Sequence, residues 1–422
     1  MSVYRLKCAV QSYAWGKIGI KSKVAQFAQD VEDFRAESDK PYAELWMGTH
    51  PNGPSVLAEQ PTTYLKDIIK SNPEVLTSEI AKLYDDLPFL FKVLSVNKAL
   101  SIQAHPNKKL GKELFEKFPK IYKDPNHKPE MAIAITRFEA LCGFRPLGEI
   151  VAFLSEYPEF RELVGNEISS HFTQTVTGKE NSNDEEKILS NKNALRKLFA
   201  AVMTADANEV TSQVERLVLR LRSSDFSMGS VQELLVRLND QFPGDVGIFC
   251  VLMLNHVILE PGQAIFLGAN EPHAYLSGDC VECMAASDNV VRAGLTPKFK
   301  DVTVLLDMLT YRYGSAESQI LNPIPYDNSK SSFLYNPPIE EFAVLLTRLD
   351  EQNKKEMCEG IAGPSIIIVT EGKGNLLVND RSERLGPGSV FFVGANVSYV
   401  VELTEDCEGL DLYRAFCSLN QG

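Results

Sequence analysis

The stretch LEPGQAIFLGANEPHAY, residues 259–275, has a close echo in LGPGSVFFVGANVSYVV, residues 385–401. In both copies a Pro-Gly turn leads into an apolar run that ends in Gly-Ala-Asn. Runs rich in β-branched and aromatic residues between turn residues are typical of buried strands. Each copy therefore predicts a strand, the Pro-Gly turn and a second strand. The alignment also places His273 opposite Tyr399, so only the first copy carries an imidazole at this position.

Further strand signals surround both copies. YAELWMG, residues 42–48, and PFLFKVLSV, residues 88–96, come before the first copy, and PSIIIVTEGKGNLLVND, residues 364–380, comes before the second. We expect the last of these to form a hairpin over its Glu-Gly-Lys-Gly turn. Antiparallel strands joined by short glycine turns, in two sets, predict two small β-barrels or sandwiches.

The hydrophobic period changes between residues 148 and 243. Apolar residues recur there at a spacing of three to four, which indicates helices. The polar link TGKENSNDEEK, residues 177–187, separates two of them. We therefore expect a mainly β chain with a helical insertion at 148–243. Residues 1–147 with 244–320 would form the first barrel, and residues 321–422 the second.

The composition of the chain excludes some classes of binding partner. The formal net charge of -13 argues against nucleic acid and against an anionic membrane as partners, since both are polyanions. The N-terminal residues lack the apolar region of a signal peptide, and no run approaches a membrane span, which predicts a cytoplasmic protein. The eight scattered cysteines fit reduced thiols. The one CxxC pair, Cys280 and Cys283, is more consistent with two buried thiols than with a metal site.

A few polar residues in the strand segments could bind a metal. His273 follows a strand end, and Gln103 and His105 lie two apart, which in a strand puts them on one face. Glu130 enters another strand candidate, next to His127 and Lys128. Two imidazoles, a carboxylate and an amide oxygen suit a divalent metal, with zinc the best match. Taken singly, each of these residues is more often structural, so the residues alone predict only a β-barrel protein with a candidate metal site.

Longer motifs carry a resemblance to a known family. They are SYAWGK (12–17), KPYAELWMGTHP (40–51), LSIQAHPNKKL (100–110), NHKPEMAIA (126–134) and PHAYLSGDCVECMAASDNVVRAGLTPKF (272–299). In this order, and over nearly the whole chain, the sequence resembles the type I phosphomannose isomerases. The resemblance implies two cupin-like, jelly-roll β-barrels, with metal in the first only.

The resemblance also implies a function. It is that of a zinc-dependent aldose–ketose isomerase that interconverts mannose 6-phosphate and fructose 6-phosphate by proton transfer through an enediolate. This reaction would feed mannose and GDP-mannose metabolism. The implied partner is a small sugar phosphate, and the expected state is a monomer with one Zn²⁺ per chain. The metal ligands fall on Gln103, His105, Glu130 and His273. Arg292 falls on the family's active-site arginine, and the substrate-binding positions fall on Glu44, Lys92, Ser101, Lys128, Glu282 and Lys298.

Some alternatives stay open at this point. The base that removes the C2 proton could be Lys128, Glu282 or a zinc-bound hydroxide. Ser101, Lys92 and Lys298 are the candidate phosphate donors by residue type. Two other classes of protein compete: an iron oxygenase with two histidines and a carboxylate, and a sugar-binding protein without turnover. Gln103 and the length of the resemblance argue against the first. An assay for fructose 6-phosphate would exclude the second.

Overall fold

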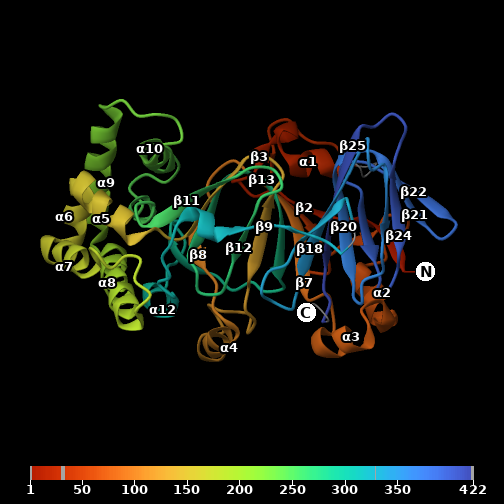
Figure 1. Ribbon diagram of the computed structural model, residues 1–422, viewed down its shortest axis with the longest axis horizontal. Coiled ribbons are helices and arrows are strands. Elements are labelled where there is room, and N and C mark those ends of the chain that lie inside the picture. The colour runs from red at the N-terminus through yellow and green to blue at the C-terminus, as the bar shows by residue number, and fades with distance from the viewer. Residues whose placement is uncertain (1, 30–33, 328, 420–422) are drawn as a thin grey trace.

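The computed structural model describes residues 2–29, 34–327 and 329–419, and its parts follow one another along the long axis (Figure 1). A group of helices lies at one end of the molecule. A sheet whose strands come from both sides of the helical segment in the sequence lies in the middle, and strands from the C-terminal quarter lie at the other end (Figure 1). The chain is thus mainly β with a helical insertion.

The middle part, here called the N-terminal β region, is an 11-stranded sheet. Its longest strand, β13, runs over His273–Ala285 and pairs with β7, β8, β9 and β10. The other strands are β2 (Ala9–Gln11), β5 (Glu44–Met47), β7 (Phe89–Val96), β8 (Ile102–Ala104), β9 (Glu130–Ala134), β10 (Phe138–Phe144), β11 (Leu254–Leu259), β12 (Ala264–Leu267), β14 (Val291–Gly294) and β15 (Ile320–Leu321). Because β13 contacts four neighbours, it brings residues from distant segments together.

The C-terminal β region consists of an 8-stranded and a 4-stranded sheet. The first has the order β16-β17-β18-β25-β20-β23-β1-β6, and the second the order β19-β24-β21-β22. Their strands are β1 (Val3–Lys7), β6 (Val56–Leu57), β16 (Ile324–Pro325), β17 (Ser332–Tyr335), β18 (Ala343–Asp350), β19 (Lys355–Cys358), β20 (Ser365–Gly372), β21 (Gly374–Val378), β22 (Arg381–Leu385), β23 (Val390–Val393), β24 (Tyr399–Leu403) and β25 (Gly409–Phe416).

The repeat seen in the sequence is present in the backbone. Strands β12 and β13 of the first copy correspond to β23 and β24 of the second, and His273 and Tyr399 each begin the second strand. The Asn of each Gly-Ala-Asn turn is left-handed, with φ of 64° at Asn270 and 60° at Asn396. Asn tolerates this conformation better than most residues because its side chain can bond locally. The predicted strand, Pro-Gly turn and strand are also confirmed in both copies, because β11 leads through the first turn into β12 and β22 leads through the second into β23.

The hairpin predicted for residues 364–380 is wrong. Strand β20 pairs with β23 and β25, whereas β21 pairs with β22 and β24, so the two strands belong to different sheets. Gly372, with φ of 80°, marks the point where the chain leaves one sheet for the other. A Cβ there would lie 1.9 Å from the carbonyl oxygen of Gly409, so only glycine fits. The hairpin is formed instead by β21 and β22.

The sheets also cross the expected domain boundary. Strand β1, near the N-terminus, pairs with β23 of the C-terminal β region, although residues 1–147 were expected to belong to the first barrel. One apolar cluster contains Phe91 of β7 and Ile366 of β20 and so spans both regions. The two β regions therefore share a core. Within β13, Cys280 and Cys283 belong to different clusters, as expected for residues three apart in a strand.

Helices occupy the insertion, as the period predicted. They are α5 (Leu147–Glu156), α6 (Pro158–Val164), α7 (Asn166–Val176), α8 (Glu185–Met203), α9 (Ala207–Arg222) and α10 (Val231–Gln241). Side chains of Asp184, Asp206 and Ser230 cap the N-termini of α8, α9 and α10 by accepting backbone N–H groups. Asp184 lies in the polar link 177–187, so the last residues of that link are helical and not part of a loop.

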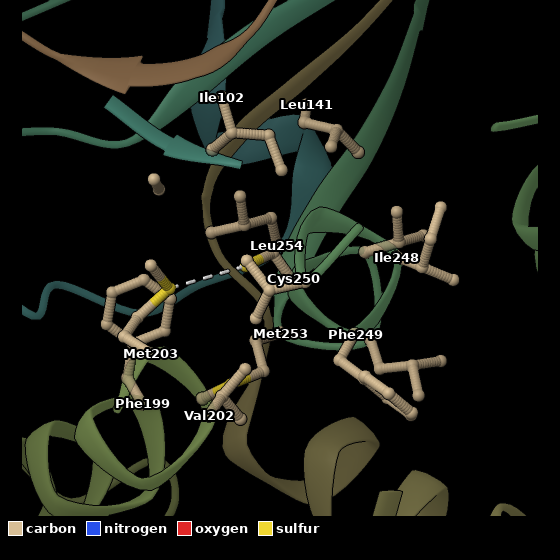
Figure 2. Close-up of a cluster of buried hydrophobic side chains, with 14 of the residues drawn as sticks. Ile102, Leu141, Phe199, Val202, Met203, Ile248, Phe249, Cys250, Met253 and Leu254 are labelled. Carbon is tan, nitrogen blue, oxygen red and sulfur yellow. Dashed lines mark hydrogen bonds between the residues drawn. The ribbon is translucent and has the colours of Figure 1, made fainter. Parts of the chain in front are cut away.

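The helices pack on the N-terminal β region through one buried cluster. Figure 2 shows Ile102 of β8 and Leu141 of β10 facing Phe199, Val202 and Met203 of α8 across the segment that carries Cys250. This segment is the short helix α11 (Gly247–Cys250), in a stretch that is apolar throughout. The remaining helices are α1 (Lys23–Ala28), α2 (Leu65–Ser71), α3 (Ser78–Tyr84), α4 (Lys108–Lys117) and α12 (Val302–Met308). Within the described ranges, no helix combines the length and the apolar character that crossing a membrane requires.

A buried carboxylate joins the two β regions. Glu341, between β17 and β18, accepts from Lys108 Nζ at 2.8 Å and contacts His127 Nε2 at 2.7 Å. Both partners come from the N-terminal half of the chain. Burial opposes ionisation of Glu341, but His127 and Lys108 prevail and hold its pKa at about 2. A carboxyl whose pKa is depressed in the folded state stabilises that state above its unfolded pKa.

We expect Glu341→Gln to lower the free energy of unfolding by about 1–3 kcal/mol at pH 7, because the ion pair with Lys108 is lost and the contact with His127 is weakened. The unfolded pKa is about 4.3. The difference from wild type should therefore stay constant down to about pH 5 and shrink as the pH falls from about 4.3 towards 2. Urea unfolding across this pH range measures it, with the exposed neighbour Glu340→Gln as control. A difference that does not depend on pH would remove the ionic role from Glu341.

Candidate metal centre

Three buried side chains, those of His105, Glu130 and His273, converge at the first residue of β13. Nε2 of His105 lies 3.4 Å from one oxygen of Glu130, and Nε2 of His273 lies 3.4 Å from the other. One potential ligand atom from each residue lies within 4.8 Å of the others. The side chains of these residues are at most 3% exposed. Two imidazole nitrogens and a carboxylate at this spacing could hold one metal ion.

The other ring nitrogen of each histidine is held by the backbone. Nδ1 of His105 lies 2.6 Å from the carbonyl oxygen of Asn289, and Nδ1 of His273 lies 3.0 Å from that of Glu271. A carbonyl accepts only, so Nδ1 carries the proton and Nε2 is left with its lone pair. Both Nε2 atoms are buried without a hydrogen-bond partner in the described part of the chain. Orphaned, correctly oriented lone pairs of this kind fit a metal ion.

The groups around this cluster favour the protonation states in which histidine and glutamate side chains bind a metal. Burial lowers the pKa of His105 to about 4, which keeps the imidazole neutral near neutral pH. Burial alone would raise the pKa of Glu130, but Lys128, with Nζ 3.2 Å away, and the two imidazoles hold this pKa well below its usual range. Neutral imidazoles and an ionised carboxylate are the forms that bind a divalent metal.

Gln103 and Arg292 lie beside this cluster. Gln103 of β8 is directly opposite both His273 of β13 and Arg292 of β14. Its Oε1 accepts from Ser101 Oγ at 3.3 Å. The predicted strand over Gln103 and His105 is shorter than expected, because β8 ends at Ala104. Arg292 is half-buried, and its guanidinium has no hydrogen-bond or ion-pair partner among residues 2–29, 34–327 and 329–419. Burial lowers its pKa.

A second buried group lies further along β13. Glu282 accepts from Tyr275 Oη at 2.8 Å and lies 3.2 Å from Lys92 Nζ. Lys92 also lies 3.9 Å from a carboxylate oxygen of Glu44 and 5.1 Å from the ring centre of Trp46. Burial would lower the pKa of Lys92, but Glu44 and Glu282 raise it. Burial raises the pKa of Glu282. The ammonium of Lys92 is thus neutralised by two carboxylates, which makes it a poor phosphate donor.

Not every predicted site residue has a contact with this centre in the described part of the chain. Lys298 is exposed, in the segment after β14, and its backbone N–H donates to Thr296 Oγ1 at 3.1 Å. Tyr275 and Trp46 were missed, although the alternation of β13 puts Tyr275 on the face of His273. The backbone carbonyls of Asn289 and Glu271 were missed as well. Every residue has a backbone carbonyl, so the residue type does not indicate which carbonyl accepts a hydrogen bond from a histidine.

Known proteins match this chain over its full length. Residues 3–147 match the catalytic domain of type I phosphomannose isomerase, residues 163–254 its helical insertion domain and residues 332–381 its C-terminal region. Mannose-6-phosphate isomerase of Saccharomyces cerevisiae is 49% identical, over 99% of each chain.

Solved structures agree. A phosphomannose isomerase mutant from Salmonella typhimurium is 32% identical, covers 99% of this chain and 100% of its own, and has a TM-score of 0.83. A zinc-bound mannose 6-phosphate isomerase is also 32% identical with the same coverage, at a TM-score of 0.82. This likeness extends from the fold to the metal, since His105, Glu130 and His273 form a cluster suited to zinc. With the catalytic, helical and C-terminal parts all matched in order, the chain belongs to the type I phosphomannose isomerase family and is an aldose–ketose isomerase.

Proposed function

We propose that this enzyme interconverts D-mannose 6-phosphate and D-fructose 6-phosphate by proton transfer through an enediolate. The observation that carries the proposal is the pair of buried imidazole Nε2 atoms left without partners on either side of the Glu130 carboxylate. The reaction moves a hydrogen between C1 and C2 and builds negative charge on a sugar oxygen. Zinc, when bound, supplies the positive charge that stabilises it.

The metal ligands are proposed to be Gln103, His105, Glu130 and His273. The amide of Gln103 is neutral, and its strand position directly opposite His273 brings it to the cluster. Glu130 would then be the only anionic ligand, so the site with a divalent ion keeps a net positive charge. A net positive site attracts a sugar oxygen more strongly than a neutralised one. We expect one zinc per chain, because the second copy offers Tyr399 in place of His273.

Arg292 is proposed to hold the reacting part of the sugar. Its strand neighbour is Gln103, and its half-buried guanidinium has no partner of its own in the described ranges. A planar fork of donors can hold two adjacent sugar oxygens while charge develops on one of them. Its position beside the metal ligands, and its unused donors, support this role.

Two side chains near the centre can carry the proton between C1 and C2. Glu282 has a raised pKa and a hydrogen bond from Tyr275, and Lys128 lies against Glu130. A carboxylate whose pKa is raised by burial is a stronger base than an exposed one, which favours the buried Glu282. Lys92 and Glu44 would orient Glu282 and the sugar hydroxyls. For the phosphate, Ser101 and Lys298 remain the proposed donors, since Lys92 is paired with carboxylates.

The proposal also covers the partners, the metabolic role and the location of the enzyme. A small sugar phosphate is the expected partner, and the product fructose 6-phosphate or mannose 6-phosphate would connect to mannose and GDP-mannose metabolism. We propose a cytoplasmic monomer that binds neither nucleic acid nor membrane, in line with its net charge of -13.

The activity itself is the first prediction. The purified chain should form fructose 6-phosphate from mannose 6-phosphate, and a coupled assay for fructose 6-phosphate measures it. A chelator should abolish the activity and added zinc should restore it, because the metal would supply the charge that stabilises the enediolate. The rate should be the same in oxygen-free buffer, which separates the isomerase from an iron oxygenase. A protein that binds the sugar phosphate without turnover would contradict the proposal.

Removal of a ligand should remove the metal. His273→Ala and Glu130→Gln should each lose zinc and activity together, because each removes a proposed direct ligand, and even the loss of a group that only orients a ligand typically costs about 10–100-fold in metal affinity. Tyr399→Phe, at the matching position of the second copy, should keep about one zinc per chain. Elemental analysis and the coupled assay on the same samples give both values. Full zinc content in His273→Ala would exclude His273 as a ligand.

Arg292→Lys tests the transition-state role. Lysine keeps the charge but not the fork, so kcat and kcat/KM should fall by similar factors, of the order of a hundredfold. Zinc content should stay normal, and the exposed Arg312→Lys should behave as wild type. Steady-state kinetics on mannose 6-phosphate decide the matter. An unchanged kcat with a much raised KM would instead make Arg292 a residue for ground-state binding.

A further inference from the structure

The C-terminal β region contains a cavity at the position that corresponds to the metal centre. The cavity measures about 880 Å³, within the usual range for small-molecule sites. Tyr399, the counterpart of His273, lines it, together with Arg414, Cys358, Leu345, Thr347 and Ser332. Tyr399 and Arg414 are each 2% exposed. The mouth of the cavity carries charges of both signs, among them Lys330, Lys355, Glu356 and Glu359.

Strand register fixes the correspondence residue by residue. Gln103 is opposite His273 in the first region, and Cys358 is opposite Tyr399 in the second. Leu267 of β12 is opposite Glu130, and its repeat partner Val393 of β23 is opposite Ser365.

The same reasoning identifies the counterpart of Glu282. Two residues after Glu130, Ala132 of β9 is opposite Glu282. Two residues after Ser365, Ile367 of β20 is opposite Arg414. Ser365 thus takes the place of Glu130, and Arg414 takes the place of Glu282. Where the first region has two carboxylates, the second has a hydroxyl and a guanidinium, so the charge of the site is reversed.

The guanidinium of Arg414 is only partly satisfied by the protein. Its Nε donates to Ser365 Oγ at 3.0 Å and one terminal nitrogen donates to the carbonyl oxygen of Glu359 at 3.2 Å. The ring centre of Tyr399 lies 5.1 Å from its central carbon. The second terminal nitrogen, Nη2, and the hydroxyl of Tyr399 are buried and form no hydrogen bond of regular geometry in the described part of the chain, although the hydroxyl lies near Cys358 and Arg414. Over the same part, Arg414 forms no ion pair with a carboxylate. Buried cations without a counter-charge are rare in proteins.

We propose that this cavity binds a small oxyanion, a phosphate or carboxylate group of a metabolite, with Arg414 as its counter-charge and Tyr399 as a second donor. The cavity is larger than either group, so the anion would belong to a molecule with a polar body. The repeat thus gives a cation site in the N-terminal β region and an anion site in the C-terminal one. The anion site contains none of the proposed catalytic residues, and this inference does not depend on the proposed reaction.

A pair of substitutions at Cys358 tests the site with little change of shape. Cys358→Asp places a carboxylate beside Arg414 and Tyr399, where it would compete with any bound anion. Cys358→Asn has nearly the same size without the charge. Replacing Arg414 itself could damage folding through its bonds to Ser365 and Glu359, so it is not the main test. Arg348→Leu is a control, since Arg348 pairs with Asp411 at 2.6 Å and does not line the cavity.

Equilibrium dialysis of the zinc-loaded full chain against labelled inorganic phosphate, and separately against malonate, measures binding. With at least one of the two anions, Cys358→Asp should bind one equivalent per chain less than Cys358→Asn and wild type, or bind about tenfold or more weakly at this site. The anion that shows the difference identifies the preferred group. Arg348→Leu should match wild type, and the turnover and zinc content of all variants should be unchanged, which shows that the metal centre is intact.

A crystal soaked with tungstate locates the anion, and density is expected against Arg414 and Tyr399. Equal binding of both anions by Cys358→Asp and Cys358→Asn would overturn the proposal. Tungstate density confined to other places would overturn it as well, and Arg414 would then have a purely structural role.

Discussion

The buried carboxylate of Glu130 sets the requirement that the rest of the metal centre meets. The residue is 2% exposed, and an isolated ionised carboxylate at such a depth costs several kcal/mol of desolvation. Positive charge must therefore lie against it. Lys128 Nζ provides part of this charge at 3.2 Å, and the two imidazole Nε2 atoms are placed so that a metal ion between them and Glu130 would provide the rest. The strands β8, β9 and β13 are arranged around this one charge.

The two copies of the repeat show that the frame and the chemistry are separable. Left-handed Asn residues at 270 and 396 and the same order of paired strands give both copies one backbone arrangement. Apolar residues of the paired strands, such as Leu267 and Val393, are fully buried in either copy. The polar positions between them differ in charge. A strand frame held by apolar packing can exchange the polar residues at its mouth, because those residues contribute little to the core.

The sequence predicted the helices and turns, which depend on local patterns. It did not predict which strands pair, because pairing joins segments that are far apart in the chain. Periodicity located the helices between Leu147 and Gln241, and turn chemistry located both copies of the repeat. The segment around Gly372 looked like a hairpin because two apolar runs flank a glycine turn. Which sheet a strand joins depends on its packing against residues that are distant in the sequence. The local pattern therefore could not show that β20 and β21 belong to different sheets. Similarly, spacing alone made Gln103, His105, Glu130 and His273 only candidates, because their sequence distances say nothing of the 3.4 Å contacts; the family motifs selected them.

The helical insertion acts on the metal centre without contributing a proposed ligand. Strand β8 has only three residues, and a ladder of that length holds a strand weakly. Its outer residues Ile102 and Ala104 are fully buried in the cluster that includes α8, and Figure 2 shows Ile102 on the side of α8. Burial of one isoleucine side chain contributes about 1.5–3 kcal/mol, more than a typical ladder hydrogen bond. Alternation then turns Gln103 to the opposite face, towards His273. The hydrophobic contact with the helices therefore fixes the direction in which the site residues of β8 point, and a change in that contact would act on the metal centre through the strand.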